Sequence, residues 1–216
     1  MEQLRTDLIP AREAGSTRLL IALHGLGDSI EGYRDVPNWL QIPWLNYLLV
    51  NAPDPYYGGY SWYDFAGDPE PGIKRSRALL TTLLESLRPN YPNEQTVVLG
   101  FSQGCLMTLE TGLRYPHKLA GMAGISGYVH DPGSIIEELS PVARQQKILW
   151  THGTRDPLIP LAGVREQKDQ LQSTGLNIDW REFQKEHTII PPEVTVIREF
   201  VIRAFGDSDQ ARSQSA

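Results

Sequence analysis

The amino-acid sequence predicts an α/β domain with a mostly parallel central sheet and helices on both faces. Short apolar runs alternate along the chain with longer segments whose apolar residues recur every three or four positions. Parallel neighbouring strands need crossover connections, which are usually helical. Polar or glycine-rich stretches follow several of the apolar runs, where the carboxyl ends of parallel strands form ligand sites. The sequence therefore predicts a site at this edge of the sheet.

Length and composition fit one domain. The chain has 216 residues, of which 40% are hydrophobic, enough for a substantial core in a single unit. Neither an internal repeat nor a linker interrupts it. We expect one domain over residues 1–206 and a disordered tail over 207–216, where the composition is polar.

Charge and cysteine content exclude several classes of protein. A net charge of −6 argues against binding to nucleic acid, which requires a basic surface. The N-terminus lacks an apolar signal region, and no run approaches the ~18 apolar residues needed to span a bilayer. The single cysteine, Cys105, excludes an intramolecular disulfide and fits a reducing compartment. We expect a cytoplasmic protein without stable membrane insertion, in which Cys105 is buried packing.

The strands and helices follow from these patterns in order. Strands are predicted at residues 19–23, 47–50, 96–100, 119–125, 147–150 and 177–183, of which those at 19–23, 47–50 and 96–100 are expected to be buried. Helices are predicted at residues 73–87, between the Ser102 turn and Pro116, around 135–139, through 164–171 and at 192–205. Residues 56–72 are rich in Tyr, Gly and Pro and are expected to form a long aromatic loop. Such loops are more often functional than not.

The segment from Thr96 to Leu106 carries the clearest chemical motif. A buried strand ends at Gly100-Phe101-Ser102-Gln103-Gly104, which has the G-x-S-x-G pattern of a nucleophile elbow. Small residues two positions before and after the serine let the strand-to-helix turn close. The pattern alone is expected about 0.1 times by chance in a chain of this composition. The strand before it and the helix after it favour a nucleophilic role for Ser102.

A serine nucleophile needs a general base and an acid that orients that base. His187 is the best candidate base, because it follows the last strand in a loop just before the last helix. His24 and His152 each precede a glycine after a strand, and we expect them to shape those turns by hydrogen bonding. His117 and His130 are expected at the surface.

Asp156 and Asp131 are the candidate acids, since each follows a predicted strand. Asp156 precedes Pro157, so it could equally be a turn residue that binds its own backbone. The chain order Ser102, Asp156, His187 favours Asp156, because it is the order associated with the α/β-hydrolase architecture.

With these residues in place, the chain resembles the carboxylesterase, acyl-protein thioesterase and lysophospholipase family of small α/β-hydrolases, over roughly residues 17–204. The resemblance rests on four blocks: Leu23-His24-Gly25-Leu26-Gly27-Asp28, Gly100-Phe101-Ser102-Gln103-Gly104, His152-Gly153-Thr154-Arg155-Asp156-Pro157-Leu158-Ile159-Pro160 and the His187 loop. Two weaker blocks lie between them: Ser61-Trp62-Tyr63-Asp64 and Ile125-Ser126-Gly127-Tyr128.

The resemblance implies an α/β-hydrolase fold, with Ser102 as nucleophile, His187 as base and Asp156 as orienting acid. It also implies an oxyanion hole formed by the backbone N–H groups of Leu26 and Gln103. We expect neither a cofactor nor a metal ion.

One position departs from the family pattern. Family members place glycine before the catalytic histidine, whereas this chain has Glu186. A positive φ there would cost glutamate about 1 kcal/mol or more, so the loop could instead take another path. The carboxylate either interacts with His187 or points to solvent.

The substrate is expected to be a lipid or small-molecule ester or thioester of short to medium acyl chain, including acylated protein as a possible substrate. The aromatic loop could form the wall of an apolar site opposite Leu26. The candidate substrate-binding residues are Leu26, Trp62, Tyr63, Tyr128 and Leu158. No insertion is long enough for a large lid domain. The sequence does not distinguish a preference for esters from one for thioesters. Two alternatives are hydrolysis of a lactone or similar small molecule and a catalytically weak ligand-binding role on the same fold. Aromatic residues that could lie at the surface also suggest a homodimer.

Overall fold

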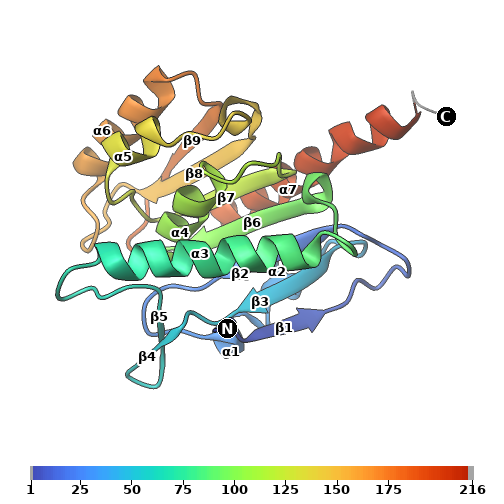
Figure 1. The fold of residues 1–216 in the computed structure, drawn as a ribbon, viewed down its shortest axis with the longest axis horizontal. Coiled ribbons are helices and arrows are strands. Elements are labelled where there is room, and N and C mark those ends of the chain that lie inside the picture. Colours follow the sequence, from blue (N-terminus) through green and yellow to red (C-terminus); the bar gives the residue numbers. More distant parts are fainter. Residues whose placement is uncertain (1, 214–216) are drawn as a thin grey trace.

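A seven-stranded sheet runs through the molecule in the order β1-β3-β2-β6-β7-β8-β9 (Figure 1). The computed structural model describes residues 2–213, with side chains described as far as residue 206. Only β1 is antiparallel to its neighbour, β3, and the other six strands are parallel. The strands are β1 (Thr6–Ile9), β2 (Leu19–Leu23), β3 (Asn46–Val50), β6 (Thr96–Phe101), β7 (Gly121–Ile125), β8 (Ile148–Gly153) and β9 (Ile178–Phe183). The predicted mostly parallel sheet is confirmed.

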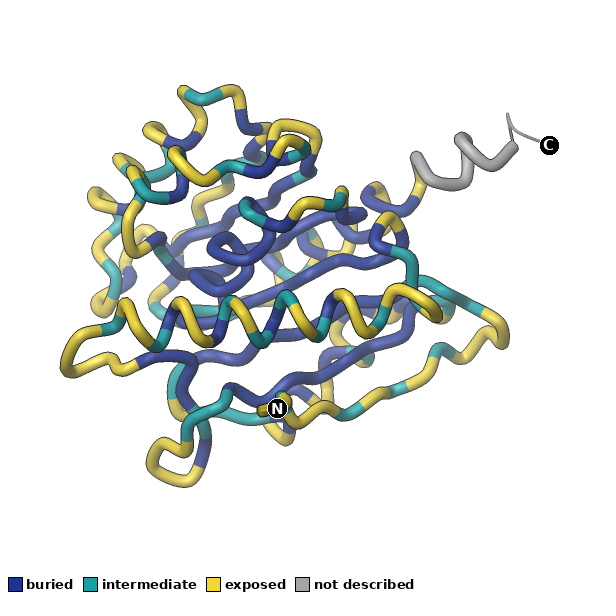
Figure 2. Tube along the Cα trace, in the orientation of Figure 1, coloured by how far each residue is buried: buried dark blue, intermediate teal, exposed yellow. Residues whose placement is uncertain are grey.

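Helices cover both faces of this sheet, because alternate strand residues point to opposite sides. One apolar cluster joins the sheet to α3 (Glu70–Leu87), α4 (Gln103–Gly112), α5 (Pro132–Glu137) and α6 (Leu161–Ser173). The other joins it to α1 (Ile30–Tyr33), α2 (Val36–Leu40) and α7 (Pro191–Ser213). Two short 3₁₀ helices lie at Asn93–Gln95 and Ala143–Gln145. Figure 2 shows buried strands between helices whose outer sides are exposed.

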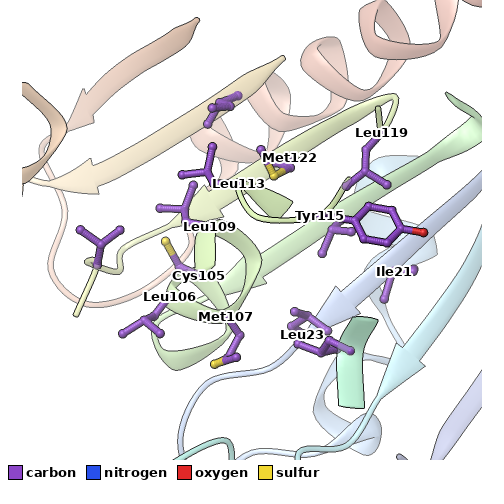
Figure 3. Packing of buried hydrophobic residues seen from close by; sticks show 14 of the residues in the cluster. Ile21, Leu23, Cys105, Leu106, Met107, Leu109, Leu113, Tyr115, Leu119 and Met122 are labelled. Atoms are coloured by element: carbon purple, nitrogen blue, oxygen red, sulfur yellow. The ribbon is translucent and has the colours of Figure 1, made fainter. Parts of the chain in front are cut away.

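Helix α4 lies deepest in the fold. Every residue from Gln103 to Gly112 is buried. Figure 3 shows Cys105, Leu106, Met107 and Leu109 on this helix within the core. A helix that is buried all round cannot shift without opening the core. The Ser102 turn therefore stands on a rigid base, and Cys105 is the buried packing residue expected from the sequence.

Within the first 61 residues, β1, the short helices α1 and α2 and one β-hairpin were not predicted from the sequence. Strand β1 is short and only half-buried, because it lies at the edge of the sheet, so it lacks a continuous apolar signal. Within the predicted aromatic loop, β4 (Asp54–Tyr56) and β5 (Gly59–Ser61) form a hairpin. Its two tip residues, Tyr57 and Gly58, both have positive φ, as expected for a two-residue hairpin turn. The expectation of a loop over residues 56–72 was wrong for residues 56–61.

Helix α7 begins one residue before its predicted start and runs to Ser213. The expected tail, 207–216, consists of residues whose side chains or whole placement lie outside the described part, so it stays a prediction, as does the domain boundary at 206. Within residues 2–213, each helix is too short or too polar to cross a bilayer.

Candidate active site

Ser102 lies in a strained turn between β6 and α4. Its backbone has φ 55° and ψ −116°, a combination that costs of order 1–3 kcal/mol for a residue with a side chain. A Cβ atom on Gly100 would lie 2.0 Å from the Gly104 carbonyl oxygen, and one on Gly104 would lie 2.2 Å from that of Leu23. Glycine is therefore required at both positions, as the G-x-S-x-G pattern predicts.

The three residues proposed from the sequence meet in one hydrogen-bonded chain. Ser102 Oγ lies 2.9 Å from His187 Nε2, and His187 Nδ1 lies 2.7 Å from Asp156 Oδ2. They come from the carboxyl ends of β6, β8 and β9, which the sheet order brings to the same edge. The Asp156 side chain is fully buried, and 13% of the His187 side chain is exposed. The imidazole also contacts the ring of Phe101, with ring centres 4.9 Å apart.

The Asp156 carboxylate is held as an anion by its surroundings. Burial raises the pKa of Asp156, but hydrogen bonds from the backbone N–H of Ile159, from His187 and from the N–H of Leu158 outweigh it and hold that pKa below its ordinary value. Oδ1 accepts from Leu158 and Ile159 at 2.9 Å each, which leaves Oδ2 for the imidazole. Asp156 is thus both a turn residue and a partner of His187.

The rival acid and the other histidines have different places. Asp131 caps α5, where its side chain accepts from the Ser134 N–H at 3.1 Å. His24 Nε2 accepts from the Ala52 N–H at 3.0 Å, so its Nδ1 donates to the Gly25 carbonyl. His152 lies beside the Ile159 carbonyl at 2.9 Å and stacks on Trp180. Burial lowers the pKa of both His24 and His152.

The two backbone N–H groups expected to form the oxyanion hole, those of Leu26 and Gln103, can be compared with the structure. Gln103 is the first residue of α4, where N–H groups lack an acceptor within the helix. Leu26 lies in the turn after β2. Among the described residues, neither N–H group donates a hydrogen bond. The N-terminus of α4 adds partial positive charge at the same place.

The candidate substrate-binding residues separate into exposed and buried sets. Leu158 is 70% exposed, and Leu26 and Tyr128 are half-buried. Tyr63 is buried, and its hydroxyl lies 3.1 Å from that of Tyr128. Trp62 is fully buried, and its indole N–H donates to the His24 carbonyl at 2.9 Å. In this structure Trp62 therefore supports the loop after β2 instead of forming an exposed wall.

The side chain of Gln103 has a role that sequence reasoning missed. Its Oε1 accepts from the Trp62 N–H at 3.0 Å, and its Nε2 donates to the Tyr63 carbonyl at 3.2 Å. This amide joins the first turn of α4 to the segment after β5. The signal in the sequence was only a polar residue next to the serine, which does not identify a contact 40 residues away.

The backbone of the loop that carries His187 has a conformation that glutamate can adopt at position 186. Glu186 is exposed, and it is not among the described non-glycine residues with positive φ. Of the two alternatives left by the sequence, the carboxylate points to solvent. Lys185, in contrast, has a fully buried side chain that pairs with Glu193 of α7, with Nζ and Oε2 2.6 Å apart. A lysine next to a polar loop gives no sequence signal for burial.

No group of three His, Cys, Asp or Glu side chains that could hold a metal ion occurs within the part of the chain whose side chains are described.

The chain is similar in sequence and in fold to known esterases and thioesterases. A family model described as phospholipase/carboxylesterase matches residues 6–204. Acyl-protein thioesterase 1 of Schizosaccharomyces pombe is 35% identical over 158 residues, which cover 67% of this chain and 70% of the relative. A probable carboxylesterase of Oryza sativa subsp. japonica is 28% identical, over 83% of this chain and 76% of its own. The crystal structure of esterase PE8 superposes with a TM-score of 0.82 at 25% identity, covering 94% of this chain and all of the esterase. These matches confirm the resemblance drawn from the motifs.

Proposed function

Because this chain belongs to the phospholipase/carboxylesterase family and is an ester or thioester hydrolase, we propose that it works through an acyl-enzyme formed on Ser102. The observation that carries the proposal is the continuous hydrogen-bonded chain from Ser102 through His187 to Asp156. A serine hydroxyl becomes nucleophilic when an adjacent imidazole accepts its proton. Ser102 lies within hydrogen-bond reach of a base that is itself oriented by a carboxylate.

In the proposed reaction, Ser102 Oγ attacks the acyl carbonyl and its proton passes to His187 Nε2. The tetrahedral oxyanion is stabilised by the N–H groups of Leu26 and Gln103, each worth roughly 3–4 kcal/mol in comparable sites. His187 then protonates the leaving alkoxide or thiolate as its bond to the acyl carbon breaks. The acyl group stays attached to Ser102 Oγ as an ester. Water, deprotonated by the same imidazole, releases the carboxylic acid and restores the serine.

We propose short to medium acyl chains as substrates, among them acyl groups carried on proteins. The half-buried Leu26 and Tyr128 and the exposed Leu158 are apolar surfaces suited to an acyl chain. Support for an acylated protein comes from the Schizosaccharomyces pombe relative, which is named an acyl-protein thioesterase. A cytoplasmic location and a homodimer stay predictions. Two of the tryptophans, Trp62 and Trp150, are buried and cannot contribute to a dimer interface.

Labelling with a fluorophosphonate probe tests the proposal. The wild-type protein should react with one equivalent of probe at Ser102, and the Ser102→Ala variant should not react. The exposed Ser173, on α6, provides a matched control, since Ser173→Ala should label like the wild type. Absence of labelling in folded wild-type protein would instead favour a ligand-binding role.

Aryl esters of increasing chain length, compared with a palmitoyl-peptide thioester and a lactone, then define the substrate class. The proposal expects the highest kcat/KM on a short or medium ester or thioester. A lactone as the best substrate would contradict it.

A further inference from the structure

Lys185, two residues before His187, is a buried cation that the proposed reaction does not use. The Lys185 and Glu193 side chains are both 0% exposed, and their charged atoms lie 2.6 Å apart. Lys185 Nζ also donates to Ser126 Oγ at 2.7 Å and to the Thr188 carbonyl oxygen at 2.8 Å. All three protons of the ammonium group therefore have acceptors.

These acceptors come from three different segments around the site. Ser126 follows β7, where a Cβ atom on the next residue, Gly127, would lie 2.7 Å from the Ser102 carbonyl oxygen. Thr188 directly follows His187, and Glu193 lies in the first turn of α7. The backbone of Lys185 adds a fourth segment, because its carbonyl accepts from the Arg155 N–H at 3.1 Å, next to Asp156. Lys185 thus contacts the loops of His187 and Asp156 directly, and through Ser126 it reaches the end of β7, where the Ile125 carbonyl accepts from the Ser102 N–H at 2.9 Å.

Stability alone does not account for this pair. Burying two charges is costly, and apolar side chains of similar volume often serve a core equally well or better. The other carboxylate oxygen of Glu193, Oε1, is buried and has no hydrogen-bond partner among the described residues. Burial lowers the pKa of Lys185, against the opposing effect of Glu193, so the charged form carries a cost. The charged form of Lys185 instead fixes geometry. Its three N–H donors lie on one nitrogen atom, so they set the distances between the three groups that accept from them.

The His187 loop needs such an external support. It lacks the local devices of the Ser102 turn: from 184 to 188 it contains no glycine, and no residue there has positive φ. Its backbone contacts within the loop include the bonds from the Lys185 N–H to the Phe183 carbonyl and from the Thr188 N–H to the Glu186 carbonyl. Neither reaches Ser126 or α7, whereas the Lys185 side chain reaches both.

We propose that Lys185 is a positioning residue, which with Glu193 sets the place of the His187 imidazole between Ser102 and Asp156. The inference rests on the proposed function, because it assigns the consequence of the contact to the Ser102 reaction. Lys185 does not touch the reacting atoms. Its loss should therefore lower kcat and leave KM nearly unchanged, since a displacement of about 1 Å can cost on the order of a hundredfold in rate.

The decisive variant separates positioning from stability. Lys185→Met alone leaves Glu193 buried and unpaired, so it should lower the melting temperature as well as kcat. The double variant Lys185→Met with Glu193→Leu removes both charges and should recover most of the melting temperature. We expect its kcat to stay reduced by about tenfold to a hundredfold with KM within about twofold of wild type. A double variant with wild-type melting temperature and kcat within about twofold of wild type would overturn the inference.

A matched control uses the same residue types at the surface. Lys74 and Glu70 on α3 form an ion pair of the same 2.6 Å length, with both side chains more than half exposed. Lys74→Met should leave kcat and KM unchanged. The proton NMR signal of His187 Nδ1–H reports the contact with Asp156 directly, and it should shift in the Lys185 variants but not in Lys74→Met.

If the double variant does not fold, Ser126→Ala decides the same question. It removes one acceptor of Lys185 without leaving an unpaired charge, and it should lower kcat several-fold at unchanged KM. An unchanged kcat and an unchanged His187 signal would contradict the inference. Fluorophosphonate labelling of wild-type Ser102 keeps the two proposals apart: if wild type labels but the Lys185 variants react at the wild-type rate, only the role of Lys185 fails.

Discussion

The turn that carries Ser102 and the loop that carries His187 are built by opposite means. The Ser102 turn is shaped locally, by two glycines that admit close backbone contacts and by a positive φ at the serine itself. The His187 loop has no residue with positive φ, and its buried Lys185 side chain reaches Ser126, 59 positions away. Local construction leaves a motif in the sequence, and construction by distant contacts does not.

Removing the nucleophile should have the largest effect of any change in the Ser102 turn. Ser102→Ala should lower kcat by about 10⁶, because the whole triad acts through this oxygen. Alanine would adopt the same strained backbone angles as serine at no greater cost, so the melting temperature should not fall. Steady-state kinetics and thermal unfolding test both statements, with Ser173→Ala as control. Turnover within tenfold of wild type would remove Ser102 from the mechanism.

On the histidine side, Asp156→Asn should lower kcat by about 10⁴. Asparagine Oδ1 can still accept from Leu158 and Ile159, so the loop should keep its shape. Its NH₂ group would then face His187 Nδ1 and favour the wrong tautomer. A crystal structure of the variant checks the loop and kinetics check the rate. A loss below tenfold would show that orientation by Asp156 is dispensable.

The close packing of the Ser102 turn can be disrupted without replacing Ser102, His187 or Asp156. Gly100→Ala places a Cβ atom 2.0 Å from a backbone oxygen and should destabilise the protein by about 1–3 kcal/mol or more. Gly163→Ala, on α6, is the matched control. No atom lies within 4 Å of its added Cβ, and alanine favours helix by up to about 1 kcal/mol. Denaturant unfolding measures both. Equal midpoints for the two variants would refute the close-contact argument.

Acid should destabilise the fold through the two buried histidines. The pKa values of His24 and His152 are lowered by burial, so below about pH 6.5 the unfolded chain binds protons that the folded protein does not. Stability should fall as the pH drops from about 6.5 toward the lowered pKa values, by about 1.4 kcal/mol for each unit that a pKa is displaced.

His152→Gln should make this loss smaller, since one of the two titrating groups is gone. Thermal unfolding between pH 5 and 8, for wild type and variant, gives the difference. Parallel curves for the two proteins would exclude His152 as a source of the pH dependence.

The smallest effect is expected at the departure from the family pattern. Glu186 is exposed and its loop does not require positive φ, so Glu186→Gln should change stability by less than about 0.5 kcal/mol and kcat by less than about twofold. A change in kcat above tenfold would mean that the carboxylate interacts with His187 after all.

Much of the fold could be predicted because its signals are local. Strand β2 was placed at its observed limits, and the other parallel strands within a few residues, since most of them are continuous buried runs; β9, at the edge of the sheet, is mostly half-buried or exposed. The β4–β5 hairpin was missed because Pro55 and two glycines argued for a loop. Trp62 was named as a candidate wall residue of the acyl site because an aromatic residue in a loop can face either way. It is fully buried, and its indole N–H binds the His24 carbonyl, a contact that no local pattern reveals.

The alternation of strands and helices, the glycine-framed turn at Ser102 and the order of serine, aspartate and histidine all follow from residues close together along the chain, through periodicity and backbone sterics. The exposure of Glu186, the burial of Lys185 and the double role of Asp156 become visible only in the folded molecule. Burial and hydrogen-bond partners are set by segments distant in sequence, which meet only when the sheet assembles.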